Sequence, residues 1–262
     1  MEKTTKTTII AIANQKGGVG KTTTAVNLAA GLQAVGKKTL CLDWDPQCNL
    51  AKYLGHQFDD LPTITDFVFN KASYMDLPSL DGLIRHSNVG IDYIPSSLRL
   101  AKAEMVLAQA MFRERVLRDI LELVIPEGYD YVIIDCNPSM GVMMTNALVA
   151  ADRVLIPVQT EDFAVDGLED MMGLIQMVKM NINPNLEILG MLPTLTANNG
   201  DSREVIDFLH REFPDLAFDT VIGRYVAAPR SVKQRKPLIG GKSKVGAQYL
   251  AATLELLERL ED

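Results

Sequence analysis

The feature that most constrains this chain is a glycine-rich turn between a buried strand and a helix. Residues 7–13 (TTIIAIA) are apolar or β-branched, which predicts a strand, and residues 21–35 have helical periodicity. The turn between them reads NQKGGVGKTT, from Asn14 to Thr23. Glycines in such a turn let backbone N–H groups face inward around an anion, and the positive end of the helix dipole points at the same place. The sequence therefore predicts a phosphate-binding loop.

The side chains of this loop predict ATP and Mg²⁺ as its ligands. Lys21 is expected to reach the β- and γ-phosphates, and the Thr22 hydroxyl is expected to ligate Mg²⁺. The strict pattern GxxxxGK[ST] would place glycine at position 15, where this chain has Gln15. A second lysine, Lys16, is unfavourable beside Lys21 unless strong negative charge lies between them, and ATP supplies that charge. The predicted nucleotide-binding residues are Lys16, Gly17, Gly18, Val19, Gly20, Lys21, Thr22 and Thr23.

Strands and helices alternate along the rest of the chain. Strands are predicted at 38–43, 89–94, 131–135, 154–158, 186–192 and 218–222. Helices are predicted at 98–124, where a break is left open, and at 145–151, 165–181, 202–213 and 246–260. This alternation predicts a doubly wound α/β fold, a mostly parallel sheet with helices on both faces. We expect a single domain over residues 1–262, with ligands at the carboxyl ends of the strands and methionines such as Met177 and Met180 as core filler.

Two of the predicted strands end in carboxylates. The strand at 38–43 runs into Asp43, Trp44 and Asp45, and the strand at 131–135 ends at Asp135. An Asp after an apolar strand is typical of the Walker B element, in which the carboxylate reaches Mg²⁺ through water. Taken alone, Asp43 and Asp45 either hold the water shell of a metal, orient a nucleophilic water or cap the next turn.

These motifs together resemble one family. The string NQKGGVGKTTTAVNLA resembles the deviant Walker A loop of the ParA/MinD ATPases, most closely in the ParA (Soj) branch. The string DWDPQ, from Asp43 to Gln47, is similar to the DxDPQ element of that family, although Trp44 is bulkier than the aliphatic residue expected. The string DCNP after the fourth strand looks like its DCPP element, with Asn137 in place of the first proline.

The resemblance implies a role for each motif residue. Lys16 would cross a dimer interface to the nucleotide of the partner, so that two chains enclose two ATP molecules as a homodimer. Asp45 would position and activate the attacking water, and Asp43 would support the Mg²⁺ side. The expected catalytic residues are Lys16, Lys21 and Asp45. The expected Mg²⁺ residues are Thr22, Asp43 and Asp135. The expected activity is a slow ATPase.

The charge of the chain is unevenly distributed. The formal net charge is -7, yet the segment 224–244 holds seven basic residues and no acidic one, which leaves the remainder at -14. Such a segment is either a solvated loop or a stripe that binds phosphates regardless of base sequence. The residues concerned are Arg224, Arg230, Lys233, Arg235, Lys236, Lys242 and Lys244.

The resemblance to the ParA branch favours the second reading of this segment. It implies an ATP-dependent dimer that binds nonspecific double-stranded DNA through C-terminal basic residues. A ParB-like adaptor would stimulate hydrolysis, and the cargo would be a plasmid, a chromosome or a large protein assembly. The family often has an arginine after the sixth strand, where this chain has TANNG from Thr196 to Gly200, and its PRN string reads GRY from Gly223 to Tyr225.

Other classes of function find less support in the residues. The N-terminal residues 1–8 are polar and lack a secretory pattern, and no apolar run reaches the ~20 residues that span a bilayer. We therefore expect a cytoplasmic, nucleoid-associated protein with no membrane partner and no N-terminal helix-turn-helix extension. A membrane-associated spatial regulator like MinD is the alternative, but the C-terminal LELLERLED, residues 254–262, is acidic. An electron-transfer or metal-delivery ATPase would need cysteines that bridge a cluster, whereas Cys41, Cys48 and Cys136 are expected to be buried singly.

Overall fold

Seven strands form one mostly parallel sheet in the described part of the chain. The structure, a computed structural model, describes residues 7–57, 59–125, 128–161 and 166–261; the polar residues 1–6 and residue 165, which begins a predicted helix, lie outside it. The strand order is β3-β4-β2-β5-β1-β6-β7, and only β3 and β4 pair antiparallel. The strands are β1 Thr8–Ile12, β2 Thr39–Trp44, β3 Arg85–His86, β4 Asp92–Ile94, β5 Tyr131–Cys136, β6 Arg153–Gln159 and β7 Glu187–Thr194. The predicted doubly wound α/β fold is confirmed.

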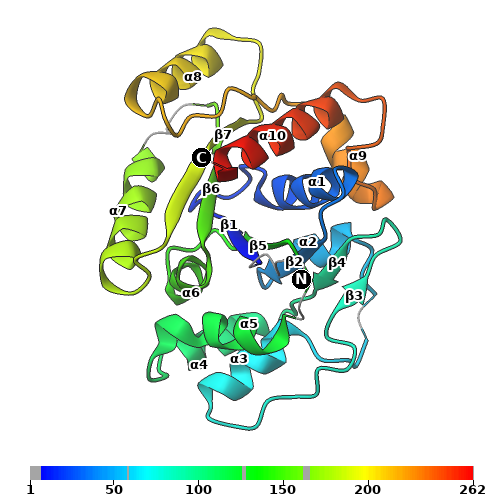
Figure 1. Cartoon of the computed structure of the whole chain (residues 1–262), viewed down its shortest axis with the longest axis vertical. Helices are drawn as coiled ribbons and strands as arrows, with labels where there is room; N and C mark the ends of the chain where they lie inside the picture. Colours follow the sequence, from blue (N-terminus) through cyan, green and yellow to red (C-terminus); the bar gives the residue numbers. More distant parts are fainter. Residues whose placement is uncertain (1–6, 58, 126–127, 162–165, 262) are drawn as a thin grey trace, which may run out of the picture.

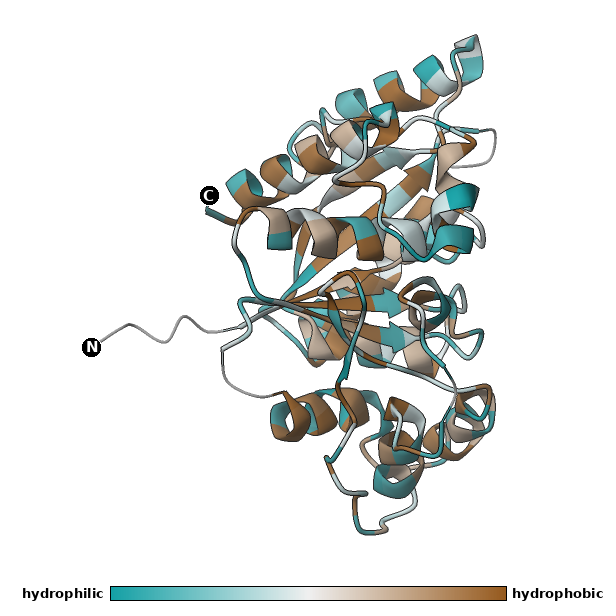
Figure 2. Ribbon diagram, turned by 90° about the vertical axis from the view of Figure 1, so that its right-hand side faces the viewer, coloured by the Kyte–Doolittle hydropathy of each residue, from teal (hydrophilic) through white to brown (hydrophobic). Residues whose placement is uncertain are grey.

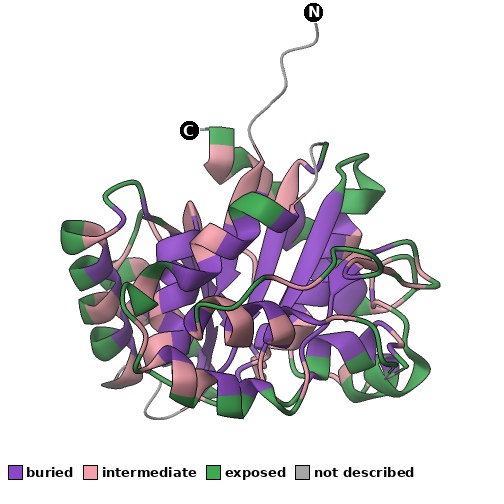
Figure 3. Cartoon of the chain, turned by 90° about the horizontal axis from the view of Figure 1, so that it is seen from below, coloured by how far each residue is buried: buried purple, intermediate pink, exposed green. Residues whose placement is uncertain are grey.

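Helices cover both faces of the sheet, because successive strand residues point to opposite sides (Figure 1). Along β1, Ile10 and Ile12 enter the core on one face, whereas Ala11 enters the core on the other. The first core is covered by α1 Lys21–Ala34, α2 Asn49–Tyr53 and α10 Lys244–Glu261. The second is covered by α3 Ile64–Ala72, α4 Leu100–Leu107, α5 Val116–Val124, α6 Val142–Ala150, α7 Asp166–Asn181 and α8 Gly200–Glu212. Apolar strands lie between these layers and are the most completely buried elements (Figures 2 and 3).

The helix that begins at the phosphate loop packs closely against the C-terminal helix. Any side chain at Gly31 of α1 would overlap the Thr253 hydroxyl of α10, so only glycine permits this approach. Nearer the loop, the Thr24 hydroxyl and the Tyr249 hydroxyl lie 3.3 Å apart in the buried interface of the same two helices. The position of α1 is therefore set by α10.

The structure settles one predicted element that was left open, corrects another and adds short helices. The stretch 98–124 is broken, since α4 ends at Leu107, the 3-10 turn η1 spans Arg113–Arg115, and Phe112 between them has a positive φ of 55°. Residues 218–222 lie beside β7, where Phe218 and Ile222 donate to its carbonyls, but they form no continuous strand, because Pro193 of β7 lacks the N–H that a full ladder requires. The helices without a predicted counterpart are short: α2, α3 and α9 Ala227–Gln234.

The methionines only partly fill the core. Met143, Met144 and Met171 are buried, as predicted. Met177 and Met180 are 53% and 73% exposed, so the prediction is wrong for these two. Both lie on the side of α7 that faces away from the sheet, where helical periodicity places no core contact.

Candidate active site

The phosphate loop joins the end of β1 to the start of α1, as the sequence predicts. Gly18 and Gly20 have φ values of +78° and +91°, a conformation that a residue with a side chain adopts only under strain. The space where a Cβ would stand is open at Gly17 as well as at these two glycines, and all three line one cleft. Because α1 begins at Lys21, the free N–H groups of its first turn lie at the same place. The geometry is that of an anion-binding loop.

Lys21 is held by the loop itself. Its Nζ donates to the carbonyl oxygens of Asn14 at 2.9 Å and Lys16 at 3.0 Å. The side chain is buried, and this burial lowers the pKa of Lys21, while the charge of Asp135 acts in the opposite direction. A buried ammonium gains from a nearby anion, and phosphate oxygens in the cleft would provide one.

Asn14 fixes the entrance of the loop, a role that the sequence patterns do not reveal. Its Nδ2 donates to the carbonyl of Pro157 in β6 at 2.7 Å, and its Oδ1 accepts from the N–H of Lys16 at 2.9 Å. Asn14 therefore ties the loop to the neighbouring strand and sets the backbone direction at Lys16. The ammonium group of Lys16 forms no ion pair with any residue that the structure describes.

Two further contacts anchor the loop from more distant elements. The Thr194 hydroxyl at the end of β7 donates to the carbonyl of Val19 at 2.8 Å. Gln15, which stands where the strict pattern has glycine, donates from Nε2 to the carbonyl of Gly167 in α7 at 3.0 Å. The departure from the motif thus creates a link between the phosphate loop and α7.

Asp43 and Asp135 lie directly opposite each other in the register of β2 and β5. Asp43 is fully buried, and its Oδ2 and Oδ1 accept from the N–H groups of Ala51 at 2.9 Å and Asp45 at 3.3 Å. Burial raises the pKa of Asp43 to about 7, although these backbone hydrogen bonds oppose the shift. The contacts give Asp43 a part in shaping the loop that carries Asp45.

Asp135 is the unusual carboxylate of the site. It is 1% exposed, and neither of its oxygens has a hydrogen bond of ordinary geometry to a described residue. Burial, followed by the charge of Asp43, raises the pKa of Asp135, whereas the nearby Thr22 hydroxyl and Lys21 oppose the rise. A buried carboxylate whose hydrogen-bonding capacity is not satisfied is unfavourable by itself and marks a position where a cation would be stabilised. With the Thr22 hydroxyl it offers the oxygen ligands that Mg²⁺ prefers, so these residues fit that ion.

Most predicted nucleotide residues meet in one cleft of about 500 Å³. It is lined by Gly17, Gly18, Gly20, Lys21, Thr22, Thr23 and Asp45. Val19 is buried outside the cleft with its carbonyl bound to Thr194, and Lys16 lies at the entrance of the loop. Lining residues that were not predicted include Gln47, Lys52 and Tyr53 from α2 and the loop before it, and Val232 from α9.

Trp44 connects the two acidic strand ends. Its side chain is fully buried opposite Cys136 in the β2–β5 register, and its Nε1 donates to the carbonyl of Met143 at 2.8 Å. Met143 belongs to the first turn of α6, which follows Asp135 and Asn137 in the chain. The indole therefore joins the loop of Asp45 to the segment after Asp135.

The structure divides the seven basic residues of the segment 224–244 into different settings. All seven are exposed. Arg224 forms an ion pair with Glu161, with Nη1 and Oε1 2.8 Å apart, so its charge is already partnered. Arg230 and Lys233 lie on α9, Arg235 ends that helix with a φ of 54°, and α10 begins at Lys244. The segment is therefore partly helical, which its composition did not indicate.

Other types of site find little support in the described residues. The three cysteines are buried, as expected. Within the described ranges, no three His, Cys, Asp or Glu residues form a group suited to hold a metal ion. No described helix combines the length and the apolar character needed to cross a bilayer.

The comparisons with known proteins agree with this geometry. Residues 7–188 match the family model described as an AAA domain. The chain is 39% identical to the chromosome partitioning protein ParA of Caulobacter vibrioides, over 97% of this chain and 95% of the relative. It is 41% identical to the sporulation initiation inhibitor protein Soj of Bacillus subtilis, over 88% of this chain and 90% of the relative.

Solved structures give the same result. Structures of a cobyrinic acid a,c-diamide synthase from Mycobacterium smegmatis, one with ADP and magnesium and one with an ATP analogue and magnesium, superpose with a TM-score of 0.82. They are 32% identical and cover 98% of this chain and 96% of their own. Given the phosphate loop, the two acidic strand ends and these full-length matches, the chain belongs to the ParA/MinD-type family of P-loop ATPases.

Proposed function

We propose that the chain is an ATP-dependent dimer switch that hydrolyses ATP slowly, binds nonspecific double-stranded DNA and positions a cargo. The observation that carries the proposal is the cleft lined by the glycine loop, Lys21 and Thr22, with the buried carboxylate of Asp135 close to the Thr22 hydroxyl. The chemistry of this set suits a magnesium-bound nucleoside triphosphate. The chain from 1 to 262 acts as a single ATPase domain in this proposal.

Hydrolysis would proceed by in-line attack of water on the γ-phosphorus. The oxygen of water forms the new P–O bond, the bond to the leaving β-phosphate oxygen breaks, and the products are ADP and phosphate. Asp45 lines the cleft and orients the water, while Lys21 stabilises the charge that develops on the phosphate oxygens. Mg²⁺, held by Thr22 and Asp135 with support from Asp43, would neutralise charge on the β- and γ-phosphates.

Lys16 is the residue that links ATP binding to dimerisation in this proposal. Its backbone is fixed by Asn14 and by Lys21, yet its ammonium group has no ion-pair partner among the described residues. In the proposed dimer this ammonium reaches the triphosphate of the partner subunit, which compensates the charge of two lysines with that of ATP. Dimerisation would therefore follow ATP binding.

The exposed basic residues are the proposed DNA contacts. Arg224 is partnered by Glu161, whereas six of the basic residues are exposed and form no ion pair with a described residue: Arg230, Lys233, Arg235, Lys236, Lys242 and Lys244. Two copies of this surface in a dimer bind a DNA backbone more tightly than one copy, because the second contact is intramolecular. An adaptor of the ParB type would stimulate hydrolysis and release the DNA, with the protein acting in the cytoplasm on the nucleoid.

A membrane switch of the MinD type is the second candidate, and the C-terminal helix disfavours it. Leu256 of α10 is fully buried in the core. Glu255 accepts from the N–H groups of Asp219 and Thr220, and Arg259 donates to the carbonyl of Asp215. The apolar face of this helix is therefore already occupied within the fold.

The test is retention on random-sequence duplex DNA without nucleotide, with ADP and with ATP, at several salt concentrations. Wild type is expected to bind only with ATP and to lose binding steeply as salt rises. Lys16→Ala is expected to abolish this binding, whereas Lys37→Ala, an exposed lysine beyond the far end of α1, serves as the matched control. Equal binding in all nucleotide states would contradict the switch, and recruitment to anionic liposomes without DNA binding would favour the membrane candidate.

A further inference from the structure

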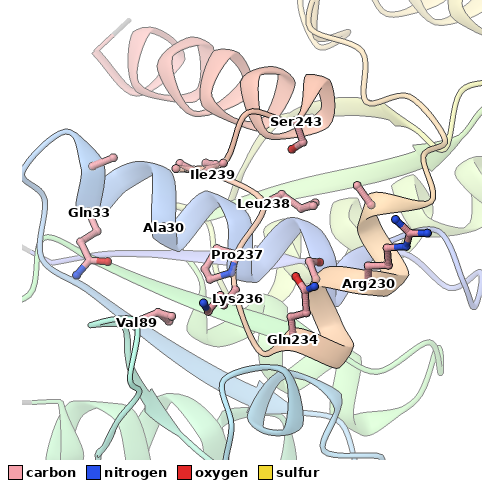
Figure 4. A pocket seen from close by; sticks show the side chains of 15 residues that line it. Ala30, Gln33, Val89, Arg230, Gln234, Lys236, Pro237, Leu238, Ile239 and Ser243 are labelled. Carbon is pink, nitrogen blue, oxygen red and sulfur yellow. The ribbon is translucent and has the colours of Figure 1, made fainter.

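A second, larger cleft lies on the other side of α9 from the nucleotide cleft. Its volume is about 870 Å³, and it is enclosed by α1, α9 and the loop at 236–243 (Figure 4). Arg230, Gln234 and Lys236 offer hydrogen-bond donors at this cleft, while Gly240 and Gly241 leave part of its wall without side chains. No acidic residue lines it in the described part of the chain. Cationic and amide donors beside bare backbone suit a phosphodiester backbone.

The helix α9 is a wall shared by both clefts. Val232 lines the nucleotide cleft, whereas Arg230, Ser231 and Gln234 of the same helix line the second cleft. Tyr53 of α2 also lines the nucleotide cleft, and its hydroxyl lies 2.5 Å from the Ser231 hydroxyl. A displacement of α9 would therefore change both clefts at once.

A second hydrogen-bonded route joins the clefts through α1. The side chain of Asn27 donates from Nδ2 to the carbonyl of Thr23 at 2.8 Å, and Thr23 lines the nucleotide cleft. The Oδ1 of the same Asn27 accepts from the N–H of Leu238 at 2.7 Å, and Leu238 lines the second cleft. The side-chain amide of Asn27 thus connects the first turn of α1 with the loop that lines the second cleft.

These groups are deeply buried. Asn27 is fully buried, Tyr53 is 1% exposed and Ser231 is 5% exposed. Buried polar networks are stiff, because breaking one hydrogen bond leaves an unsatisfied group that costs ~1–3 kcal/mol. A change at the nucleotide cleft is therefore transmitted to α9 and to residue 238 rather than absorbed locally.

We propose that the network of Asn27, Tyr53 and Ser231 couples the nucleotide cleft to the α1–α9 cleft, which receives the phosphodiester backbone of duplex DNA. The inference rests on the proposed function and adds to it a mechanism within one protomer. ATP in the first cleft holds Tyr53 and Thr23 in place, and these hold α9 and Leu238 in the arrangement that presents Arg230 and Lys236. Dimerisation supplies two such surfaces, and the network sets the affinity of each.

The experiment compares the affinity for a random-sequence duplex in MgATP with the affinity in MgADP. In wild type this ratio is expected to exceed about tenfold, within the usual range of coupling between two sites. Ser231→Ala removes the hydroxyl that faces Tyr53, and the ratio is expected to fall to about threefold or less. Tyr53→Phe removes the other hydroxyl and is expected to give the same loss, and the double variant is expected to add nothing further.

Two matched variants separate coupling from contact. Ser243→Ala removes a hydroxyl in the same cleft that accepts from the N–H of Gly246 and lies outside the network, so the ratio should stay at the wild-type value. Lys242→Ala removes an exposed charge of the segment 224–244 that does not line the α1–α9 cleft, so the affinity should fall by a similar small factor in both nucleotide states and leave the ratio unchanged. Thermal unfolding of each variant checks that it is folded.

The outcomes distinguish this inference from the proposed function. If wild type binds duplex DNA in neither state, the proposed function fails. If wild type shows the nucleotide dependence and Ser231→Ala keeps it, only the coupling network is overturned. Loss of the ratio together with loss of ATP-dependent dimerisation, measured by sedimentation, would also overturn it, because the effect would then arise between protomers.

Discussion

The nucleotide cleft and the basic segment carry charge in opposite ways. In the cleft, Lys21, Asp43 and Asp135 are buried, and each is placed by strand register or by a backbone hydrogen bond. In the segment 224–244 the basic residues are exposed, and they follow a short helix and a loop. Buried charges depend on exact geometry, whereas exposed charges act mainly through their number. Substitutions should therefore have large, position-specific effects in the cleft and small, cumulative effects in the segment.

The sharpest test of this contrast is Lys21→Ala. The side chain is buried and donates to two loop carbonyls, and in the proposed mechanism its loss removes the stabilisation of the transferred phosphoryl group. Phosphate release from ATP should fall by at least ~100-fold. Lys52→Ala is the matched control, because Lys52 lines the same cleft but donates to Gln47 on its rim. A similar loss in both variants would show that position within the cleft matters little.

The next largest effect is expected for Asp135→Asn, which separates function from stability. Because burial raises the pKa of Asp135, the native state binds a proton more tightly than the unfolded state, and stability falls as pH rises above the unfolded value. The nucleotide-free variant should therefore be more stable than wild type at pH 8, by ~1–3 kcal/mol, while hydrolysis is lost. The stability difference should shrink toward pH 4, and denaturant titrations at both pH values measure it. A variant less stable than wild type at pH 8 would mean that the attraction between the Asp135 carboxylate and the charge of Lys21 outweighs the cost of burial.

A smaller effect is expected for Trp44→Phe, which keeps an aromatic ring but removes the hydrogen bond to Met143. The free energy of unfolding should fall by ~1 kcal/mol, and hydrolysis should slow more than ATP affinity changes, since the indole joins the two acidic strand ends. In wild type, Trp44 is the single tryptophan of the chain, so tryptophan fluorescence reports only on the surroundings of Trp44. Emission that does not respond to MgATP would argue against a movement of this segment.

The smallest effect is expected for Lys242→Ala in the basic segment. One exposed charge should lower DNA affinity only a few-fold and reduce the slope of log affinity against log salt by ~0.9. Pairs of such substitutions should add, which titrations at four salt concentrations would show. If Lys242→Ala alone abolished binding, the segment would behave like the buried cleft, and the comparison would fail.

The sequence predicts the nucleotide end well because its signals are local. The glycine turn, Lys21 and the two acidic strand ends each depend on the residues beside them, so pattern and geometry agree. Asn14, Thr194 and Tyr53 were not predicted, because each acts through a carbonyl or a hydroxyl that lies far away in sequence. No periodicity or motif records such contacts.

For the basic segment, the sequence predicted the concentration of positive charge but not the secondary structure. Its α9 spans eight residues, too short for periodicity to reveal, and Pro229 within it weakens a helical pattern. Arg224 forms an ion pair with Glu161, whereas Arg230 lines the second cleft. This difference depends on the folded arrangement and cannot be read from composition. The predicted strand at 218–222 is only partly formed for a related reason, since Phe218 and Ile222 donate to carbonyls of β7 but Pro193 interrupts a continuous ladder.

The tight crossing of α1 and α10 at Gly31 has a practical consequence for how this protein can be divided. The matched family region ends at residue 188, and every nucleotide motif lies before that point. Yet the helix that carries Lys21 rests on a helix that begins at Lys244. A fragment that ended at residue 188 would contain every nucleotide-binding motif but would lack α10, which packs against α1 and holds it in position. We therefore expect that the smallest fragment able to bind nucleotide extends almost to the last residue.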